Sequence, residues 1–251
     1  MRTLFLILSG ATILLLISGT AHACQCLVQA PASTEYWRAD AVFVGSVTDI
    51  VPSFDDLESS LRTKNRKVSF SVETTYRGTI GVRIDLQNWI NSCEIRFEKG
   101  HKYLIYAYRN SDDNSLDAQG CSRTTEFAQA TDDLRYLNAL KRGTVHQDIS
   151  GTIQDPGFRR PHVGISVIAT INGRHLKATS DRNGNFKIPV PGPGQYTVKI
   201  YFPAGYAIGG PAAYIDKIKN VTTTQTQTIV EYQLTLAKGQ CEFLAVPALE
   251  P

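Results

Sequence analysis

Five cysteines restrict the fold of this chain more than any other feature, because they follow an apolar leader that directs export. They occupy positions 24, 26, 93, 121 and 241. Residues 1–23 begin with a basic Arg2, continue through an apolar core and end in Ala21-His22-Ala23, the small-x-small pattern that precedes a signal-peptidase cut. We therefore expect residues 1–23 to be a signal peptide and the mature chain to begin at Cys24. In an exported protein, cysteines form disulfide bonds by default.

A membrane anchor and a lipoprotein signal are the alternatives for this leader. Its apolar core is short for a membrane span and is interrupted at Ser9-Gly10 and at Gly19. A bacterial lipoprotein also carries a cysteine at the cut, but its signal prefers a Leu-like residue where this chain has Ala21. Lipidation of Cys24 is the lesser alternative. No later run approaches the length of a span, so we expect no membrane span and a secreted, periplasmic or cell-envelope protein.

The C-x-C pair formed by Cys24 and Cys26 limits which disulfide bonds the chain can form. These two residues cannot bond comfortably to each other, so we expect two different partners, most simply Cys93 and Cys121. Whichever of the two bonds to Cys93 and which to Cys121, each disulfide closes a loop of roughly 70 to 100 residues. Such a loop stabilises a fold by about 4 to 5 kcal/mol in the chain-entropy model. Cys241 is then left free, buried or intermolecular. A C-x-C pair with distant single cysteines and no nearby histidine is weak zinc spacing, so we expect no permanently bound metal.

Residue patterning divides the chain into a mixed first part and an all-strand second part. Residues 24–142 show apolar alternation typical of about five strands, with a short first helix and a terminal helix. The expected helices cover 31–40 and 125–140, the expected strands 41–47, 67–73, 82–86 and 103–108, and an acidic loop covers 111–119.

The second part contains strands separated by turns. Residues 143–149 are polar and predict a linker with few contacts across it. Over 150–251, turns recur every 8 to 12 residues, a spacing typical of a small β-sandwich that needs no helix. Asn172-Gly173 predicts a hairpin, and residues 181–186 predict a second tight hairpin turn. The fold class expected for the whole chain is mainly β.

Several segments of the first part carry a family resemblance. They are 24–26 (CQC), 38–45 (RADAVFVG), 93–100 (CEIRFEKG), 103–107 (YLIYA) and 121–124 (CSRT). Together they resemble the netrin-like module of tissue inhibitors of metalloproteinases and its bacterial relatives, over residues 24–142. The resemblance implies an OB-like five-stranded barrel with disulfides Cys24–Cys93 and Cys26–Cys121.

The sequence departs from the animal inhibitors at identifiable positions. Their third bridge in this domain has no counterpart, because Tyr36-Trp37 occupies the segment where one of its cysteines would lie. Gln25 stands where they carry a small hydroxyl residue, and the resemblance implies that this side chain would enter a protease pocket. The second part is also unlike theirs. Residues 150 to about 236 resemble instead the carboxypeptidase regulatory-like, transthyretin-like β-sandwich, an accessory module that implies no chemistry by itself.

Enzymatic chemistry is not expected from this sequence. It contains no H-E-x-x-H, G-x-S-x-G or Walker motif, and the histidines of the expected mature chain are scattered. The formal net charge of +3 is too mild to predict a nucleic-acid partner. We expect a protein without cofactor that is not an enzyme.

One group retains specific chemistry, the α-amine of a mature N-terminal Cys24. Its nitrogen and the Cys24 carbonyl oxygen could chelate the catalytic zinc of a metalloendopeptidase, with Gln25 beside it. The expected function is therefore inhibition of a zinc metalloprotease. The alternative stays open because the disulfides could serve only to stabilise a barrel. It is an extracellular or envelope binding or structural module without inhibitory activity.

Overall fold

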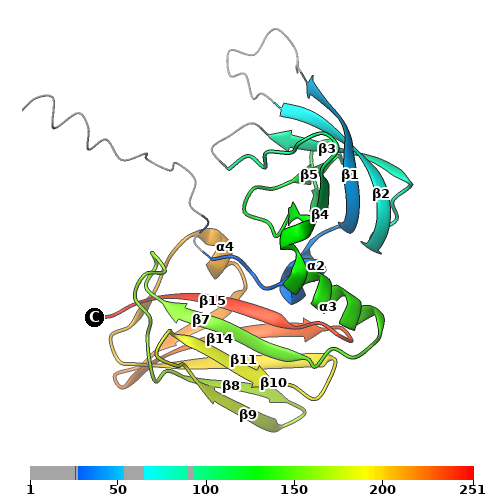
Figure 1. Ribbon diagram of the computed structural model, residues 1–251. Coiled ribbons are helices and arrows are strands. Elements are labelled where there is room, and N and C mark those ends of the chain that lie inside the picture. Colours follow the sequence, from blue (N-terminus) through cyan, green and yellow to red (C-terminus); the bar gives the residue numbers. More distant parts are fainter. Residues whose placement is uncertain (1–25, 27, 54–64, 90–92) are drawn as a thin grey trace, which may run out of the picture.

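The computed structural model describes residues 26, 28–53, 65–89 and 93–251, and it shows a mainly β protein with two regions (Figure 1). The first region is a closed barrel of five strands. In barrel order these are β1 (Ala41–Ser53), β2 (Asn65–Arg77), β3 (Arg83–Trp89), β5 (Leu116–Ala118) and β4 (Lys102–Arg109), with β4 pairing back onto β1. All neighbours are antiparallel except β3 and β5, so the barrel is a mixed, OB-like one.

Smaller elements complete the first region. Strand β6 (Thr125–Glu126) pairs with β4, the 3-10 helix η1 (Phe127–Gln129) follows it, and the helices are α2 (Ala32–Arg38) and α3 (Thr131–Lys141). The two α-helices contact each other beside the barrel.

Apolar patterning explains why these strands close a barrel. In β2, Val68 and Phe70 are fully buried, while Lys67 is exposed and Ser69 is half-buried, as alternation requires. Strands β1 and β4 instead bury both faces, because one face lines the barrel and the other packs under α3. Their continuous apolar runs follow from that double burial. Inside the barrel, Phe70 contacts Phe43 and Phe97 edge to face.

The second region is a sandwich of two sheets. One sheet has the order β10 (Asn185–Pro189), β7 (Asp148–Gln154), β15 (Glu242–Leu249) and β12 (Ala207–Ile208). The other has the order β13 (Ile218–Thr223), β14 (Gln227–Leu236), β11 (Gly194–Pro203), β8 (Ser166–Ile171) and β9 (Arg174–Thr179). A contiguous apolar core fills the space between them. Strands β7 and β15 run parallel, which joins the end of the chain to the first strand of the sandwich.

Some turn predictions hold and others need correction. Asn172 and Gly173 both have positive φ, 47° and 75°, and join β8 to β9 in the predicted hairpin. The turn at 181–186 is not a hairpin, because it leads from β9 in one sheet to β10 in the other. Its tightness comes from the Asp181 side chain, which accepts hydrogen bonds from the backbone N–H groups of Asn183 and Asn185.

Several short elements contradict the sequence-based expectation. Strand β6 and the 3-10 helix η1 occupy 125–129, so the helix expected over 125–140 begins only at Thr131. The predicted acidic loop contains β5, which is needed to close the barrel between β3 and β4. The sandwich contains a short helix, α4 (Ala212–Ile215), where none was expected; it packs against β15. No helix among the described residues is long and apolar enough to cross a membrane.

A small number of contacts join the two regions. Tyr136 of α3 donates a hydrogen bond to the carbonyl oxygen of Gly239 at 3.1 Å, and it accepts one from the Trp37 indole at 3.2 Å. Arg38 of α2 lies 3.9 Å from the carboxylate of Glu242 in β15. The barrel and its helices are therefore seated against one sheet of the sandwich (Figure 1).

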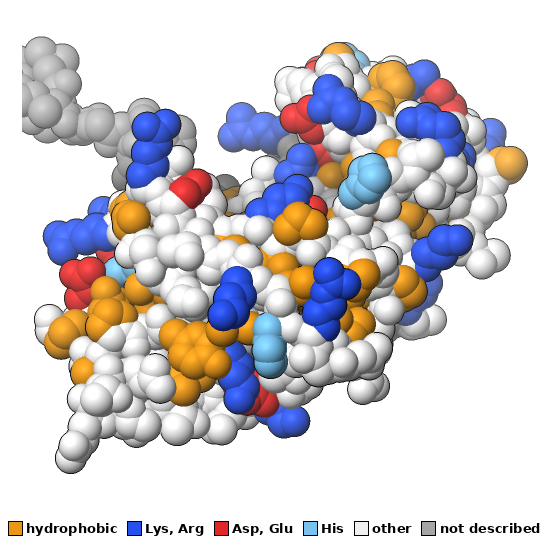
Figure 2. Space-filling view, turned by 90° about the horizontal axis from the view of Figure 1, so that it is seen from below, with side chains coloured by type: hydrophobic (Ala, Val, Ile, Leu, Met, Phe, Trp, Pro, Cys, Tyr) orange, Lys and Arg blue, Asp and Glu red, His pale blue; other side chains and the backbone are white. Residues whose placement is uncertain are grey.

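The surface seen from below in Figure 2 carries Lys and Arg side chains dispersed among hydrophobic and uncharged ones. That distribution accords with the low net charge of +3.

Candidate functional site

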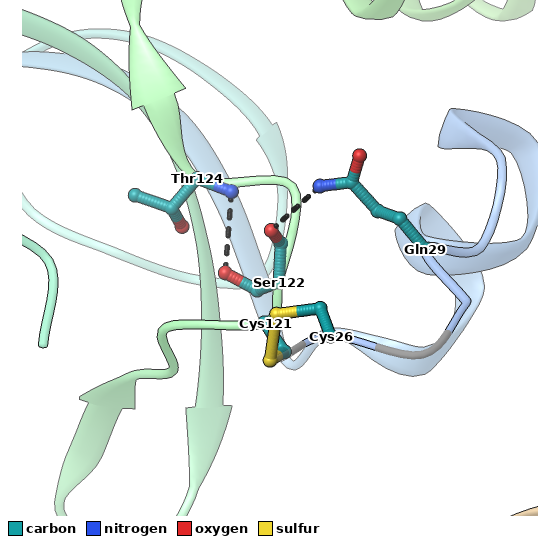
Figure 3. The surroundings of a disulfide bond; sticks show 5 residues. All are labelled: Cys26, Gln29, Cys121, Ser122 and Thr124. Atoms are coloured by element: carbon teal, nitrogen blue, oxygen red, sulfur yellow. Dashed lines mark hydrogen bonds between the residues drawn. A yellow bond between two sulfur atoms is a disulfide. The ribbon is translucent and has the colours of Figure 1, made fainter. Parts of the chain in front are cut away.

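The segment that leads into the barrel is anchored by a disulfide bond. Cys26 is bonded to Cys121 in the loop after β5, with their Cα atoms 5.6 Å apart (Figure 3). This is one of the two pairings that the resemblance implies, and it indicates an oxidising, extracytoplasmic compartment. The predicted bond between Cys24 and Cys93, and the zinc-chelating role predicted for Cys24 and Gln25, lie outside the described residues because residues 1–25 do.

Hydrogen bonds hold the chain that follows Cys26. The Gln29 side-chain amide donates to the carbonyl oxygen of Ser122 at 3.1 Å, and the Ser122 hydroxyl accepts from the backbone N–H of Thr124 (Figure 3). The guanidinium of Arg123 donates to the carbonyl oxygen of Ala30. Residues 26–30 are therefore fastened to residues 121–124 by one covalent bond and two hydrogen bonds, while Cys26 itself is exposed.

Arg123 is in turn held by a buried carboxylate. Its Nε and Nη2 atoms each lie 2.6 Å from an oxygen of Asp133, whose Oδ1 also accepts a hydrogen bond from the Tyr106 hydroxyl. Asp133 is only 3% exposed. The residue pair Asp132-Asp133 by itself predicts the polar side of a helix, and for Asp133 this prediction is wrong. Hydrogen bonding to Asp133 raises the pKa of Arg123, so this guanidinium stays charged.

A second buried carboxylate lies at the first helix. Glu35 of α2 accepts a hydrogen bond from the Tyr108 hydroxyl at the end of β4. Burial raises the pKa of Tyr108, so the phenol keeps its proton and acts as the donor. The bond fixes α2, and thereby the end of the anchored segment, against the barrel.

The loop that carries Cys93 lies directly against the loop that carries Cys121. A Cβ atom built on Gly120 would lie 1.5 Å from the carbonyl oxygen of Cys93, so only glycine fits between them. The structure thus brings together Cys26, Cys93 and Cys121, three of the four residues predicted to form disulfides. The fifth cysteine, Cys241, is a free, buried thiol whose sulfur lies 3.6 Å from the carbonyl oxygen of His146.

A pocket of about 280 Å³ lies beside this anchor, between the two regions. Its lining residues from the first region are Val28, Ala30, Glu35, Arg38, Gln119 and Cys121, and those from the sandwich are Tyr214, Lys217, Tyr232, Phe243, Leu244 and Ala245. The sequence contains no signal for this pocket, because its walls come from segments about 200 residues apart. No group of three or more metal-ligating side chains is found in the described ranges.

No protein-family model matches this chain, and a search of curated proteins finds no match. What the structure shows is the OB-like barrel, its Cys26–Cys121 bond and the sandwich that follows.

Proposed function

We propose that the protein is an exported inhibitor of zinc metalloendopeptidases that acts through its mature N-terminus. The observation that carries this proposal is the anchoring of Cys26. An exposed residue, two positions after the predicted start of the mature chain, is covalently bonded to the barrel. The chain beyond it is held by Gln29 and by Arg123. An anchor at Cys26 would limit the freedom of a short N-terminal segment that precedes it.

The chemistry of an N-terminal cysteine suits a protease zinc. An α-amine with a pKa of about 7.7 to 8 is partly unprotonated near neutral pH, so its nitrogen can bind a metal. The amine nitrogen and the Cys24 carbonyl oxygen would close a five-membered chelate at the position that a catalytic zinc keeps open for water. A segment tethered at Cys26 would lose less conformational freedom on binding than an untethered one. Gln25 would point into the adjoining substrate pocket.

The netrin-like identity of the barrel and the carboxypeptidase regulatory-like identity of the sandwich belong to the same proposal. The five-strand barrel and the Cys26–Cys121 bond support the first, and the two-sheet sandwich supports the second. In this account the sandwich is an accessory domain, and the protein is secreted or held in the periplasm or cell envelope. Its partner is a zinc metalloprotease, and it needs no cofactor of its own.

An N-terminal extension tests the proposal. One added Ala before Cys24 moves the amine out of chelating reach and leaves the cysteines unchanged. We expect the native protein, with a free Cys24 amine confirmed by mass spectrometry, to inhibit at least one member of a panel of zinc endopeptidases, and the extended protein to lose at least 100-fold in affinity, about 2.7 kcal/mol. Gln25→Thr should strengthen binding. Peptide mapping of the disulfides in both proteins is the control. Equal inhibition by the two forms would contradict the mechanism.

One observation favours the alternative, an extracellular or envelope binding module without inhibitory activity. The pocket between the regions is lined by Tyr232, whose buried hydroxyl lacks a partner in the described chain. If the native protein with a free Cys24 amine inhibits no member of the panel, this alternative replaces the first proposal. An acylated Cys24 would have the same consequence, because acylation blocks the chelating nitrogen.

A further inference from the structure

The pocket between the regions contains a phenol that has no hydrogen-bond partner. Tyr232 of β14 is 1% exposed, and its hydroxyl makes no hydrogen bond within the described part of the chain. It lines the pocket together with Leu244 and Ala245 of β15. Burial raises its pKa, so the group remains a protonated donor. A buried hydroxyl without an acceptor is destabilising, and such groups normally have a partner.

Tyr196 on the neighbouring strand β11 shows the ordinary arrangement. It is equally buried, and its hydroxyl donates to the carbonyl oxygen of Gly192 at 2.7 Å. Two buried tyrosines in one sheet therefore differ in a single respect, the acceptor for the phenol. Tyr232 lines the pocket, but its hydroxyl has almost no surface that water reaches, so an acceptor for it would have to press into the wall of the pocket.

The guanidinium of Arg38, which lines the same pocket, also has N–H groups without a hydrogen-bond acceptor among the described residues. Arg38 lies 3.9 Å from Glu242 Oε1 and makes no hydrogen bond among the residues described. The same oxygen accepts a hydrogen bond from Lys217 at 2.6 Å, so Glu242 is already neutralised by a closer partner. The carboxylate that lines the pocket, Glu35, is bonded to Tyr108. The pocket thus contains the Tyr232 phenol, which has no acceptor, and the partly exposed Arg38, whose ion-pair partner Glu242 is held more closely by Lys217.

One wall of the pocket is an open strand edge. Strand β15 pairs with β7 on one side, but on the other side β12 reaches only Ala248 and Leu249. Residues 243–245 line the pocket and have no strand partner on that side among the described residues, where the other neighbour of β15 is the helix α4. Free main-chain groups of this kind pair readily with an extended peptide.

We propose that this pocket binds a small carboxylate ligand. The carboxylate of the ligand pairs with Arg38, and a second acceptor oxygen of the ligand accepts a hydrogen bond from the Tyr232 hydroxyl. Arginine and carboxylate groups pair in a favourable planar geometry. The volume of about 280 Å³ lies at the lower end of ligand sites, so the bound group is small. The carboxylate comes either from a peptide C-terminus, which would also use the open edge of β15, or from a free organic acid. This proposal does not depend on protease inhibition.

Calorimetric titration of the full mature protein tests the proposal. The probes are N-acetyl-Ala-Ala acid, its C-terminal amide and propionate. We expect the acid to bind at least tenfold more tightly than the amide, and Arg38→Gln to abolish that difference. Tyr232→Phe should weaken binding of the acid about 3- to 10-fold, the effect of one hydrogen bond. Binding of propionate alone as tightly as the dipeptide acid would identify a free acid as the source, and weaker binding of propionate would identify a peptide C-terminus.

Tyr196→Phe is the matched control, because it removes a buried phenol that already has an acceptor. It should leave binding unchanged and lower the melting temperature of the unliganded protein, whereas Tyr232→Phe should leave that temperature unchanged or raise it. The proposal is overturned if neither acid binds at 10 mM, if acid and amide bind equally, or if Tyr232→Phe binds the acid as tightly as the native protein.

Discussion

The barrel and the sandwich are held together in different ways. In the sandwich, β11 and β14 pair continuously from Gly194 opposite Leu236 to Pro203 opposite Gln227, and apolar side chains fill the space beneath. In the barrel, β3 and β5 share a single paired position. The Cys26–Cys121 bond lies in the loop that follows β5, and the Arg123–Asp133 pair joins that loop to α3. The barrel, which has few backbone pairs between β3 and β5, thus also relies on a disulfide and an ion pair to connect its segments.

Removing the disulfide should produce the largest difference between the regions. The double variant Cys26→Ser, Cys121→Ser opens a loop with a sequence separation of 95, so the barrel should lose about 4 to 5 kcal/mol of unfolding free energy. Both tryptophans, Trp37 and Trp89, belong to the barrel region, so tryptophan fluorescence during urea unfolding reports on that region alone.

The sandwich provides the internal control in the same titration. Both regions contribute to far-ultraviolet circular dichroism, which should therefore show a second, later transition from the sandwich. Its unfolding free energy should lie within about 1 kcal/mol of the value in the native protein, since the core of the sandwich makes no use of the disulfide. A loss of equal size in both signals would show that the two regions unfold as one unit, and the contrast between them would then be wrong.

Breaking the buried ion pair should have the next largest effect. Asp133→Asn leaves the Arg123 guanidinium, 20% exposed, without its counter-charge, and should cost about 2 to 4 kcal/mol in the fluorescence transition. Asp132→Asn is the matched control, because that neighbouring carboxylate is 79% exposed and pairs only with Arg135. It should change stability by less than about 0.5 kcal/mol. Similar losses in the two variants would refute a structural role for Asp133.

A smaller change should uncouple the regions. Tyr136→Phe removes the hydroxyl that bridges the Trp37 indole and the Gly239 carbonyl oxygen, at a cost of about 1 kcal/mol. The fluorescence and circular dichroism transitions should then move apart. Tyr201→Phe, a half-buried position of β11, is the control and should leave both unchanged. If Tyr136→Phe leaves the separation of the two transitions as it was, this bridge does not couple the regions.

The smallest expected effect concerns pH. Burial raises the pKa of Asp117 in β5, so the folded state binds its proton more tightly than the unfolded chain does. Stability therefore falls as pH rises from about 3.9, the unfolded value, through the raised pKa. Asp117→Asn keeps an acceptor for the Trp89 indole, should remove this pH dependence, and should raise stability at pH 7 by less than about 1 kcal/mol. A loss of stability at pH 7 would contradict the assigned cause.

Periodicity predicted the long strands because their burial is regular. Val68 and Phe70 alternate with polar residues, and the apolar run at 103–107 is buried on both faces, so both segments carry an unambiguous signal. The three residues of β5 are too short for any period to be detected. The turn at Asp181 has the residues of a hairpin, and nothing local distinguishes a hairpin from a crossing between sheets.

Site features depended on partners that are distant in sequence. Asp133 follows another aspartate on a helix, and only its contact with Arg123 explains its burial. The orphan phenol of Tyr232 could not be predicted, because a strand pattern indicates that a side chain is buried and not what its hydroxyl meets. The Cys26–Cys121 bond was predicted by the family resemblance. The cysteine spacing alone limited the partners of Cys26 without choosing between them.

The most direct test of the central claim observes the metal. In a cobalt(II)-substituted zinc endopeptidase, a Cys24 amine and carbonyl that replace the bound water would raise the coordination number from four to five and change the visible absorption spectrum. We predict this change with the native protein at saturating concentration, and no change with the form that carries one Ala before Cys24. An unaltered cobalt spectrum across the panel, with the free Cys24 amine verified by mass, would contradict the account.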